Sequence, residues 1–308
     1  MPIKVQKDLP AREILERENI FVMDEERALH QDIRPLSILF LNLMPKKEEA
    51  ELQNLRCLSN SALQVDVTFM KVASHEFKNA SLSHLNRFYV EFEDIKEDTF
   101  DGMIITGAPV ELLEFEEVDY WDELTRIFEW SERYVTSVMY QCWAAQAAMY
   151  YFYGLKKRNL PEKIFGVFWH EVQHRRLPIL RGFDDVFLAP HSRNADTPLE
   201  EIRKCDKIII HAASKEAGFF LGSADLGKKI FVQGHPEYDR LTLQQEYERD
   251  INKGLDIKPP VNYFEDDDPA KRPLLRWRSH SINLYMNWLN YYVYQRTPYI
   301  ITDIKKLV

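Results

Sequence analysis

The sequence predicts an α/β protein whose sheet is mostly parallel and is covered by helices on both faces. Apolar runs of the length of buried strands recur along the chain, and helix-like stretches separate several of them. Three of these runs end in chemically distinctive residues, namely Gly107, Cys142 and His235. Strands that alternate with helices favour a parallel sheet, and ligands bind such sheets beyond the carboxyl ends of the strands.

The composition is that of a folded globular protein. The chain has 308 residues, of which 45% are apolar and 29% charged, so it can bury a large core. Its net charge of −9 argues against a broad surface for nucleic acid or anionic membranes. We find no signal peptide, and the longest apolar runs, such as residues 36–44, are too short to span a bilayer. Three scattered cysteines exclude a disulfide framework, so we expect a cytoplasmic location.

The first half of the chain shows the alternation most clearly. Residues 1–34 are charged and weakly periodic, and we expect an extension packed on a single α/β domain of residues 35–298. Residues 299–308 are expected to form a tail. Apolar or alternating runs predict strands at 36–43, 63–70, 102–107 and 135–141. Helical spacing predicts helices at 48–59, at 120–134 and from 143 onward.

The second half continues the pattern with more irregular spacing. Strands are predicted at 208–212, 218–222 and 229–233, and residues 166–169 look extended. Thr242 and Gln245 have the spacing of a helix capping box, with Gly254 closing that helix, and a final amphipathic helix is predicted at 279–295. The three aspartates at 266–268 are predicted to be a solvated loop, because no neighbouring ligand completes a metal site.

Cys142 is the first candidate for chemistry. It lies at a tight turn from a strand into a helix, where the partial positive charge of the helix start favours a thiolate. The first N–H groups of that helix can hold the oxygen of a tetrahedral intermediate. On its own, the same pattern also fits a small buried cysteine, and Cys57 and Cys205 are interpreted as structural.

His235 and Glu237 are the second candidate. They flank Pro236 directly after a predicted strand, and in an extended segment residues i and i+2 point to the same side. Glu237 can then orient one nitrogen of His235 while the other faces a thiol, which is the arrangement of a catalytic triad. His170 and His174 have the spacing of zinc ligands on a helix, but their segment looks extended, so no metal site is predicted there.

With these residues in view, the chain resembles the MetA-type homoserine O-acyltransferases, which have a class I glutamine amidotransferase-like (flavodoxin-like) fold. The resemblance covers essentially the whole chain. It is carried by seven motifs in the same order, at residues 42–47, 106–109, 142–144, 182–185, 189–193, 234–238 and 287–294.

The resemblance implies roles for individual residues. Cys142 would be acylated by an acyl-CoA, His235 would be the general base, and Glu237 would orient it. Lys47 would lie near the developing oxyanion, together with the backbone N–H of Trp143. Residues that would line the substrate site are Lys163, Ser192 and Arg249, of which Arg249 can hold a carboxylate bidentately. The partners would be L-homoserine and acetyl-CoA, with no bound cofactor or metal, and we expect a homodimer.

One position bears on the choice of acyl group. Within the resembling family, users of succinyl-CoA typically carry glycine after the Pro-Val pair and users of acetyl-CoA carry glutamate; here the residue is Glu111. A glutamate would fill the space of a succinyl carboxylate and repel it, by ~1 kcal/mol at about 4 Å in water and more in a drier pocket. The sequence therefore predicts O-acetyl-L-homoserine as the product, for methionine synthesis. Glu111 could also be a solvated acid, since its loop carries further glutamates.

Three other activities stay open from the residues alone. One is transfer of succinyl from succinyl-CoA. A second is a glutamine-hydrolysing amidotransferase half, although many of those enzymes carry glycines two residues either side of the cysteine, where this chain has Tyr140 and Ala144. The third is a non-enzymatic thiol sensor, which would not need the oriented base at His235.

Overall fold

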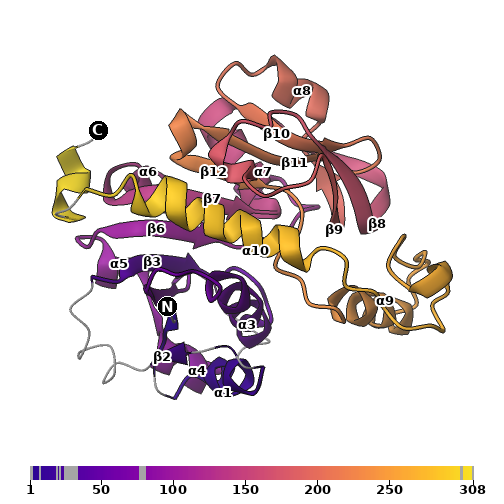
Figure 1. Ribbon diagram of the computed structural model, residues 1–308, viewed down its shortest axis with the longest axis horizontal. Coiled ribbons are helices and arrows are strands. Elements are labelled where there is room, and N and C mark those ends of the chain that lie inside the picture. The colour runs from indigo at the N-terminus through magenta and orange to yellow at the C-terminus, as the bar shows by residue number, and fades with distance from the viewer. Residues whose placement is uncertain are drawn as a thin grey trace.

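One large sheet organises the molecule. The computed structural model describes residues 3–6, 8–18, 20, 22–23, 34–75, 81–298 and 301–306. Within these residues, twelve strands form a single sheet in the order β2-β1-β4-β3-β6-β7-β12-β11-β10-β8-β9, with β5 pairing β4. Figure 1 shows this sheet running through the whole molecule, with helices before and behind it.

The central strands are parallel, as predicted. They are β4 (Val65–Met70), β3 (Leu36–Leu41), β6 (Phe100–Ile105), β7 (Val135–Gln141) and β12 (Lys229–Val232). Every residue of β6, β7 and β12 is buried. Burial on both faces explains why these strands read as continuous apolar runs in the sequence.

Helices cover both faces of this parallel part. Alternation along β3 shows the two layers: Ile38 and Phe40 pack into one core cluster, and Leu39 and Leu41 into the other. The first cluster includes residues of α3 (Lys47–Leu58) and α10 (Arg278–Asn287). The second includes residues of α6 (Trp121–Tyr134) and α7 (Trp143–Tyr153). In Figure 1, α10 lies across β6 and β7 on the near face.

The amino-terminal extension adds structure to the edge of the sheet. Strands β1 (Ile3–Lys4) and β2 (Val22–Met23) continue the sheet beyond β4, and α1 (Pro10–Arg17) packs on the core through the fully buried Leu15. Two-residue strands carry no periodicity, which is why the sequence did not predict them. The same side of the molecule carries three further short elements, α4 (Leu82–Phe88), β5 (Tyr89–Val90) and α5 (Phe92–Ile95).

The opposite end of the sheet is antiparallel. Strands β11 (Gly218–Ala224) and β10 (Ile209–Ser214) lead to a long hairpin of β8 (Arg158–Val172) and β9 (Val186–Asp196). The sequence predicted only residues 166–169 of this hairpin as extended. Its outer half is charged and contains Pro161, so neither alternation nor apolar runs mark it. After the hairpin comes the short α8 (Leu199–Lys204).

Two predictions about the carboxyl-terminal helices need correction. The capping box is wrong, because α9 (Thr242–Asn252) begins after Leu241 and has no side-chain cap. Thr242 instead accepts hydrogen bonds from the Gln53 side chain at 3.0 Å and the Asp239 backbone N–H at 3.1 Å. The final helix is α10 followed by a π-helical stretch, η5 (Trp288–Tyr294), rather than one regular helix.

The remaining elements are short. Four short 3-10 helices lie in loops: η1 (Phe115–Glu117), η2 (Pro178–Leu180), η3 (Asp225–Gly227) and η4 (Glu265–Asp267). A fifth, η6 (Ile301–Lys306), lies in the expected tail. In the described part of the chain, no helix combines the length and the apolar character that crossing a bilayer requires.

Candidate active site

Cys142 lies at a strained turn between β7 and α7. Its backbone has φ 48° and ψ −114°, a conformation that residues other than glycine rarely adopt. The turn is held by the Cys142 N–H, which donates to the Val232 carbonyl at 2.7 Å on the neighbouring strand β12. Such strain costs about 1–3 kcal/mol and persists where the surrounding structure imposes it, typically at functional sites. It presents the thiol at the start of α7, as a nucleophile elbow does.

Gly107 makes room for this turn. A Cβ atom added at Gly107 would lie 3.0 Å from the Cys142 Cβ and 3.5 Å from the Trp143 backbone nitrogen. A side chain at this position would therefore collide with the Cys142 turn, which explains why the strand ends in glycine. Trp143, which directly follows Cys142, supplies the first N–H of α7, and such an N–H has no partner within the helix.

His235 follows β12 and joins the thiol to Glu237. The His235 Nδ1 lies 2.7 Å from the Glu237 Oε1, and the His235 side chain also hydrogen-bonds to Cys142. The Tyr238 ring stacks on the imidazole, with centroids 4.1 Å apart. The segment is a turn rather than the extended stretch that we predicted, because the Tyr238 N–H donates to the His235 carbonyl at 3.2 Å. Proline at the second position of such a turn is common, and the turn still places the two side chains together.

The electrostatics of this cluster favour an imidazolium. Burial disfavours a charged imidazole, but the Cys142 sulfur and the Glu237 carboxylate outweigh burial and raise the pKa of His235 well above its ordinary value. All three side chains are buried, with Cys142 only 5% exposed. The arrangement thus suits a thiolate–imidazolium pair, the reactive form of a cysteine nucleophile.

Lys47 begins α3 and is almost fully buried. Its ammonium donates to the Asn42 carbonyl, and the Asn42 side chain donates back to the Lys47 carbonyl at 3.2 Å. Burial lowers the pKa of Lys47 to about 7, although Glu51 acts in the opposite direction. Lys47 therefore changes its charge near neutral pH.

Lys163, Ser192 and Arg249 come together through two acids of α9. Lys163 lies 3.2 Å from Asp250 and 3.7 Å from Glu246, and Ser192 donates to Glu246. The Arg249 Nε lies 2.7 Å from Asp250. These residues contact the α9 acids rather than the triad directly.

Glu246 connects this ionic cluster to the triad, and the sequence did not predict it. The Tyr238 hydroxyl donates to the Glu246 Oε1 at 2.9 Å, and the same Tyr238 ring stacks on His235. Glu246, Arg249 and Asp250 are three and four positions apart, so they share one face of α9. The sequence shows this spacing. A charged helix face is usually exposed to solvent, however, so the spacing alone did not predict a binding site.

Glu111 is half-buried, and its side chain is anchored by hydrogen bonds. Its Oε1 accepts from the Asn194 backbone N–H at 2.9 Å and from the Asn194 side chain at 2.6 Å. Its carbonyl accepts from Lys157 at 2.9 Å. The carboxylate is thus hydrogen-bonded to β9, two residues after Ser192, and its role in donor choice stays a prediction.

Strand β9 also carries a buried cation, Arg193, which we did not predict as a site residue from the sequence. Arg193 is fully buried and donates to the His191 Nδ1 and the Ala217 carbonyl. Because arginine can only donate, His191 must carry its proton on Nε2, which lies 2.9 Å from the His170 Nε2. Burial lowers the pKa of Arg193, while the charges of Cys142, Asp196 and Glu111 act against that.

The remaining candidates have structural surroundings. Cys57 is fully buried and Cys205 partly so, and both are free thiols. His170 is engaged with His191, and among the described residues no cluster of three or more His, Cys, Asp or Glu side chains could hold a metal ion.

Solved structures of glutamine amidotransferases share this fold. A glutamine amidotransferase from Thermotoga maritima has a TM-score of 0.53 at 12% identity, covering 85% of this chain and 100% of its own. A glutamine amido transferase from Methylobacillus flagellatus has a TM-score of 0.50 at 13% identity, covering 84% and 95%. At such identities the likeness shows the fold alone.

Sequence relatives are far closer. A homoserine O-acetyltransferase from Agathobacter rectalis is 59% identical over 308 residues, covering 100% of this chain and 99% of the relative. One from Geobacillus kaustophilus is 59% identical over 299 residues, covering 97% and 99%. One from Petrotoga mobilis is 52% identical over 308 residues, covering both chains fully. The sequence profile described as homoserine O-succinyltransferase matches residues 2–299. The chain therefore belongs to the homoserine O-succinyltransferase family, whose members include proteins named for acetyl transfer.

Proposed function

We propose that this protein transfers an acetyl group from acetyl-CoA to the hydroxyl of L-homoserine, through an acyl-enzyme on Cys142. The observation that carries the proposal is the strained Cys142 turn in hydrogen-bond contact with the His235–Glu237 pair. Family membership supports homoserine as the acceptor, and the relatives' names support acetyl as the acyl group. O-acetyl-L-homoserine would then serve methionine synthesis, in a cytoplasmic homodimer.

In the first half-reaction the Cys142 thiolate attacks the thioester carbonyl of acetyl-CoA. The Trp143 N–H and the Lys47 ammonium would stabilise the oxyanion of the tetrahedral intermediate. The bond from the carbonyl carbon to the coenzyme A sulfur then breaks, and the His235 imidazolium gives its proton to that sulfur. The products are coenzyme A, acetyl-Cys142 and a neutral His235. Because one thioester replaces another, this step costs little free energy.

In the second half-reaction homoserine is the nucleophile. Neutral His235, oriented by Glu237, takes the proton of the homoserine hydroxyl as its oxygen attacks the acetyl carbonyl. The bond to the Cys142 sulfur breaks, which restores the thiolate beside an imidazolium. Arg249 and Lys163 would bind the homoserine carboxylate, and Glu246, with Ser192, would face its ammonium group.

Glu111 supports acetyl over succinyl as the acyl group. Its carboxylate is fixed by Asn194, two residues along β9 from Ser192, so it cannot swing away from a second carboxylate. A succinyl group would bring its terminal charge toward this fixed anion.

Intact-mass measurement tests the acyl-enzyme directly. After mixing with acetyl-CoA alone and rapid quenching, we expect the mass of one acetyl group on the protein, lost again when homoserine is added. Cys142→Ser should abolish the thioester adduct, and Cys205→Ser, the matched control, should retain it. The proposal is wrong if no adduct forms at any time, or if an adduct forms equally in Cys142→Ser.

A further inference from the structure

The proposed acyl donor carries three phosphate groups that the candidate active site does not accommodate. Coenzyme A ends in an adenosine with a 3′-phosphate and a pyrophosphate, whereas this chain has a net charge of −9. The proposed function assigns the cations of the site to other groups: Lys47 to the oxyanion, and Lys163 and Arg249 to the homoserine carboxylate. The phosphates therefore need another cationic surface close to the same elements.

A groove that is lined by chain neighbours of the catalytic candidates has a suitable size and charge. It lies between α3, the start of α9 and the start of α10, and has a volume of about 820 Å³. Pockets that hold small ligands typically measure about 300–1,000 Å³. Its basic lining residues are Lys46, Arg56, Arg240 and Arg278. Its acidic ones are Glu18, Glu49 and Asp239, so the groove has an excess of positive charge in an acidic protein.

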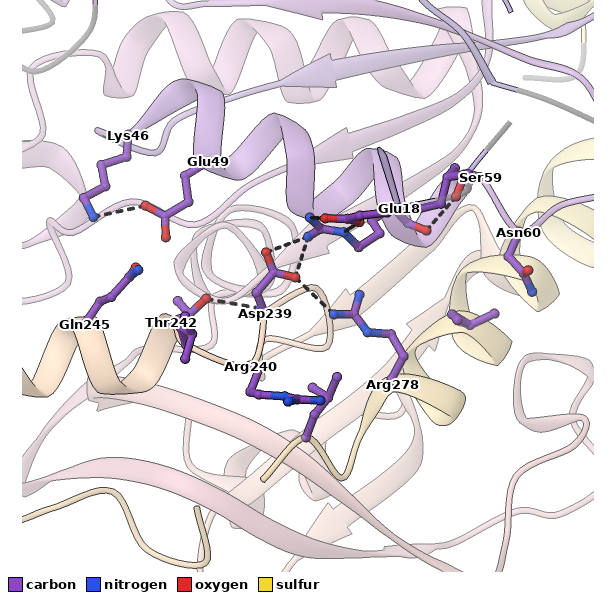
Figure 2. A pocket seen from close by; sticks show the side chains of 15 residues that line it. Glu18, Lys46, Glu49, Ser59, Asn60, Asp239, Arg240, Thr242, Gln245 and Arg278 are labelled. Atoms are coloured by element: carbon purple, nitrogen blue, oxygen red, sulfur yellow. Dashed lines mark hydrogen bonds and ion pairs between the residues drawn. The ribbon is translucent and has the colours of Figure 1, made fainter. Parts of the chain in front are cut away.

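Asp239 holds two of the arginines in place. Arg56 contacts both Asp239 oxygens at 2.5 and 2.6 Å, and Arg278 contacts the same carboxylate at 3.1 Å (Figure 2). Arg278 lines the groove and contacts Asp239 through one terminal guanidinium nitrogen, and a guanidinium carries five N–H donors. Arg240 is exposed and forms no ion pair with any part of the chain that the structure describes. In Figure 2 its side chain extends below the Asp239 network and is joined to it by no dashed line.

The walls of the groove are chain neighbours of the catalytic candidates. Asp239 follows Glu237 by two residues, Lys46 precedes Lys47, and Gln245 precedes Glu246. A ligand in the groove would thus contact residues one or two positions along the chain from Glu237, Lys47 and Glu246. Thr242 fixes this corner, since it accepts hydrogen bonds from both α3 and Asp239.

We infer that this groove binds the phosphorylated nucleotide of the acyl-CoA donor, with Arg240 and Arg278 as its phosphate ligands. The inference rests on the proposed function, because it assigns a place to part of the donor in that reaction. Arginine suits the role, since its planar guanidinium can bind two phosphate oxygens at once.

Two donors with the same thioester separate this groove from the catalytic chemistry. Acetyl-pantetheine carries the acetyl group but no nucleotide. In Arg240→Glu we expect the ratio of KM for acetyl-CoA to KM for acetyl-pantetheine to rise about tenfold or more, because a charge-assisted contact is lost and a repulsion is gained. Adenosine 3′,5′-bisphosphate should compete with acetyl-CoA in the native protein, more strongly than inorganic phosphate does, and more weakly in the variant.

Arg276→Glu is the matched control. Arg276 is exposed two residues before Arg278 but does not line the groove, and the substitution makes the same change in net charge. The inference is overturned if the KM ratio stays constant in Arg240→Glu, or if Arg276→Glu changes it equally. It is also overturned if adenosine 3′,5′-bisphosphate inhibits no better than inorganic phosphate. A native protein that neither donor acetylates would instead overturn the proposed function.

Discussion

The parallel part of the sheet and its antiparallel end contribute to the candidate site in different ways. In the parallel part, the backbone positions the catalytic candidates. The Cys142 N–H donates to a carbonyl of β12, and Cys142 and His235 lie in turns at the ends of strands. At the antiparallel end, side chains position one another: Lys163, Ser192 and Arg249 are held by the acids of α9, and Glu111 by Asn194 of β9.

This difference separates reactivity from substrate choice. A strained turn inside a buried sheet cannot relax without unfolding its neighbours, so the nucleophile keeps one geometry. The ionic cluster lies partly in water, where individual ion pairs contribute less. Substitutions in the parallel part should therefore change the rate of acyl transfer, whereas those at the antiparallel end should change KM and donor preference.

The largest effect is expected for Glu237→Gln. An amide would remove the charge that raises the pKa of His235 and would no longer impose the orientation of the ring. By analogy with the loss of the acid in serine protease triads, kcat for acetyl transfer should fall by about 10⁴. Steady-state kinetics measure this, with the exposed Glu248→Gln as the control. A decrease of less than tenfold would show that Tyr238 stacking alone suffices to orient His235.

Lys47→Met should have the next largest effect. Loss of one oxyanion donor typically lowers kcat by about 10²–10³. In the native protein the rate of Cys142 acetylation should also fall as the pH rises through about 7, because Lys47, with its pKa lowered to about 7, then loses its charge. Stopped-flow records of thioester consumption between pH 6 and 8 measure both effects. A decline near pH 7 that persists unchanged in the methionine variant would exclude Lys47 as its origin.

The lowered pKa of Lys47 should also make the free energy of unfolding depend on pH, which gives an independent check of that pKa. Its folded pKa of about 7 lies below the value of 10.5 for the unfolded chain. Between these values the unfolded chain binds more protons, so the free energy of unfolding should gain a contribution that rises with pH. That contribution should vanish in Lys47→Met, which urea titrations at pH 7 and pH 9 can detect.

Glu111→Gly should change donor choice at the antiparallel end. Removing a fixed carboxylate frees space and removes repulsion, so the ratio of kcat/KM for succinyl-CoA to that for acetyl-CoA should rise by roughly 10- to 100-fold. Glu114→Gly is the control, since Glu114 is exposed in the same loop and glycine is tolerated at its helix-capping position. An unchanged preference for acetyl-CoA in Glu111→Gly would mean that another residue selects the donor.

The sequence predicted the parallel part of the site better than the antiparallel end, for a physical reason. The strand before Cys142 and the strand before His235 are buried on both faces, so their apolar runs and the turns that end them are visible without a structure. The pairing of His235 with Glu237 was also anticipated, although the backbone between them is a turn.

The sequence of the antiparallel end contains few local patterns from which its strands or its site residues can be predicted. The outer part of the β8–β9 hairpin is polar, and α9 is a charged helix whose buried acids look like solvated ones in the sequence. Roles for Lys163, Ser192 and Arg249 came only from a family resemblance, and Glu246, Asp250 and Asn194 were missed. Two of these pairings join residues more than 80 positions apart, namely Glu111 with Asn194 (|i−j| = 83) and Lys163 with Asp250 (|i−j| = 87).

Asp250→Asn should have the smallest effect and tests whether the ionic cluster is prearranged for substrate. The carboxylate engages the Arg249 Nε and the Lys163 ammonium, which leaves the terminal guanidinium nitrogens of Arg249 to receive a carboxylate. Two consequences of the substitution oppose each other. The two cations lose an internal competitor, which favours binding of the homoserine carboxylate. Arg249, which is 48% exposed, also regains side-chain freedom worth up to about 2 kcal/mol.

We expect the lost orientation of Arg249 to outweigh, by a small margin, the stronger attraction of the two cations for the homoserine carboxylate. The reason is that water screens this attraction. KM for homoserine should rise about three- to tenfold, while the rate of Cys142 acetylation, which does not involve homoserine, stays constant. Asp256→Asn, at an exposed acid beyond the end of α9, is the control. A fall in KM would mean that Asp250 chiefly neutralises the two cations, and the antiparallel end would then select substrate by net charge rather than by prearranged geometry.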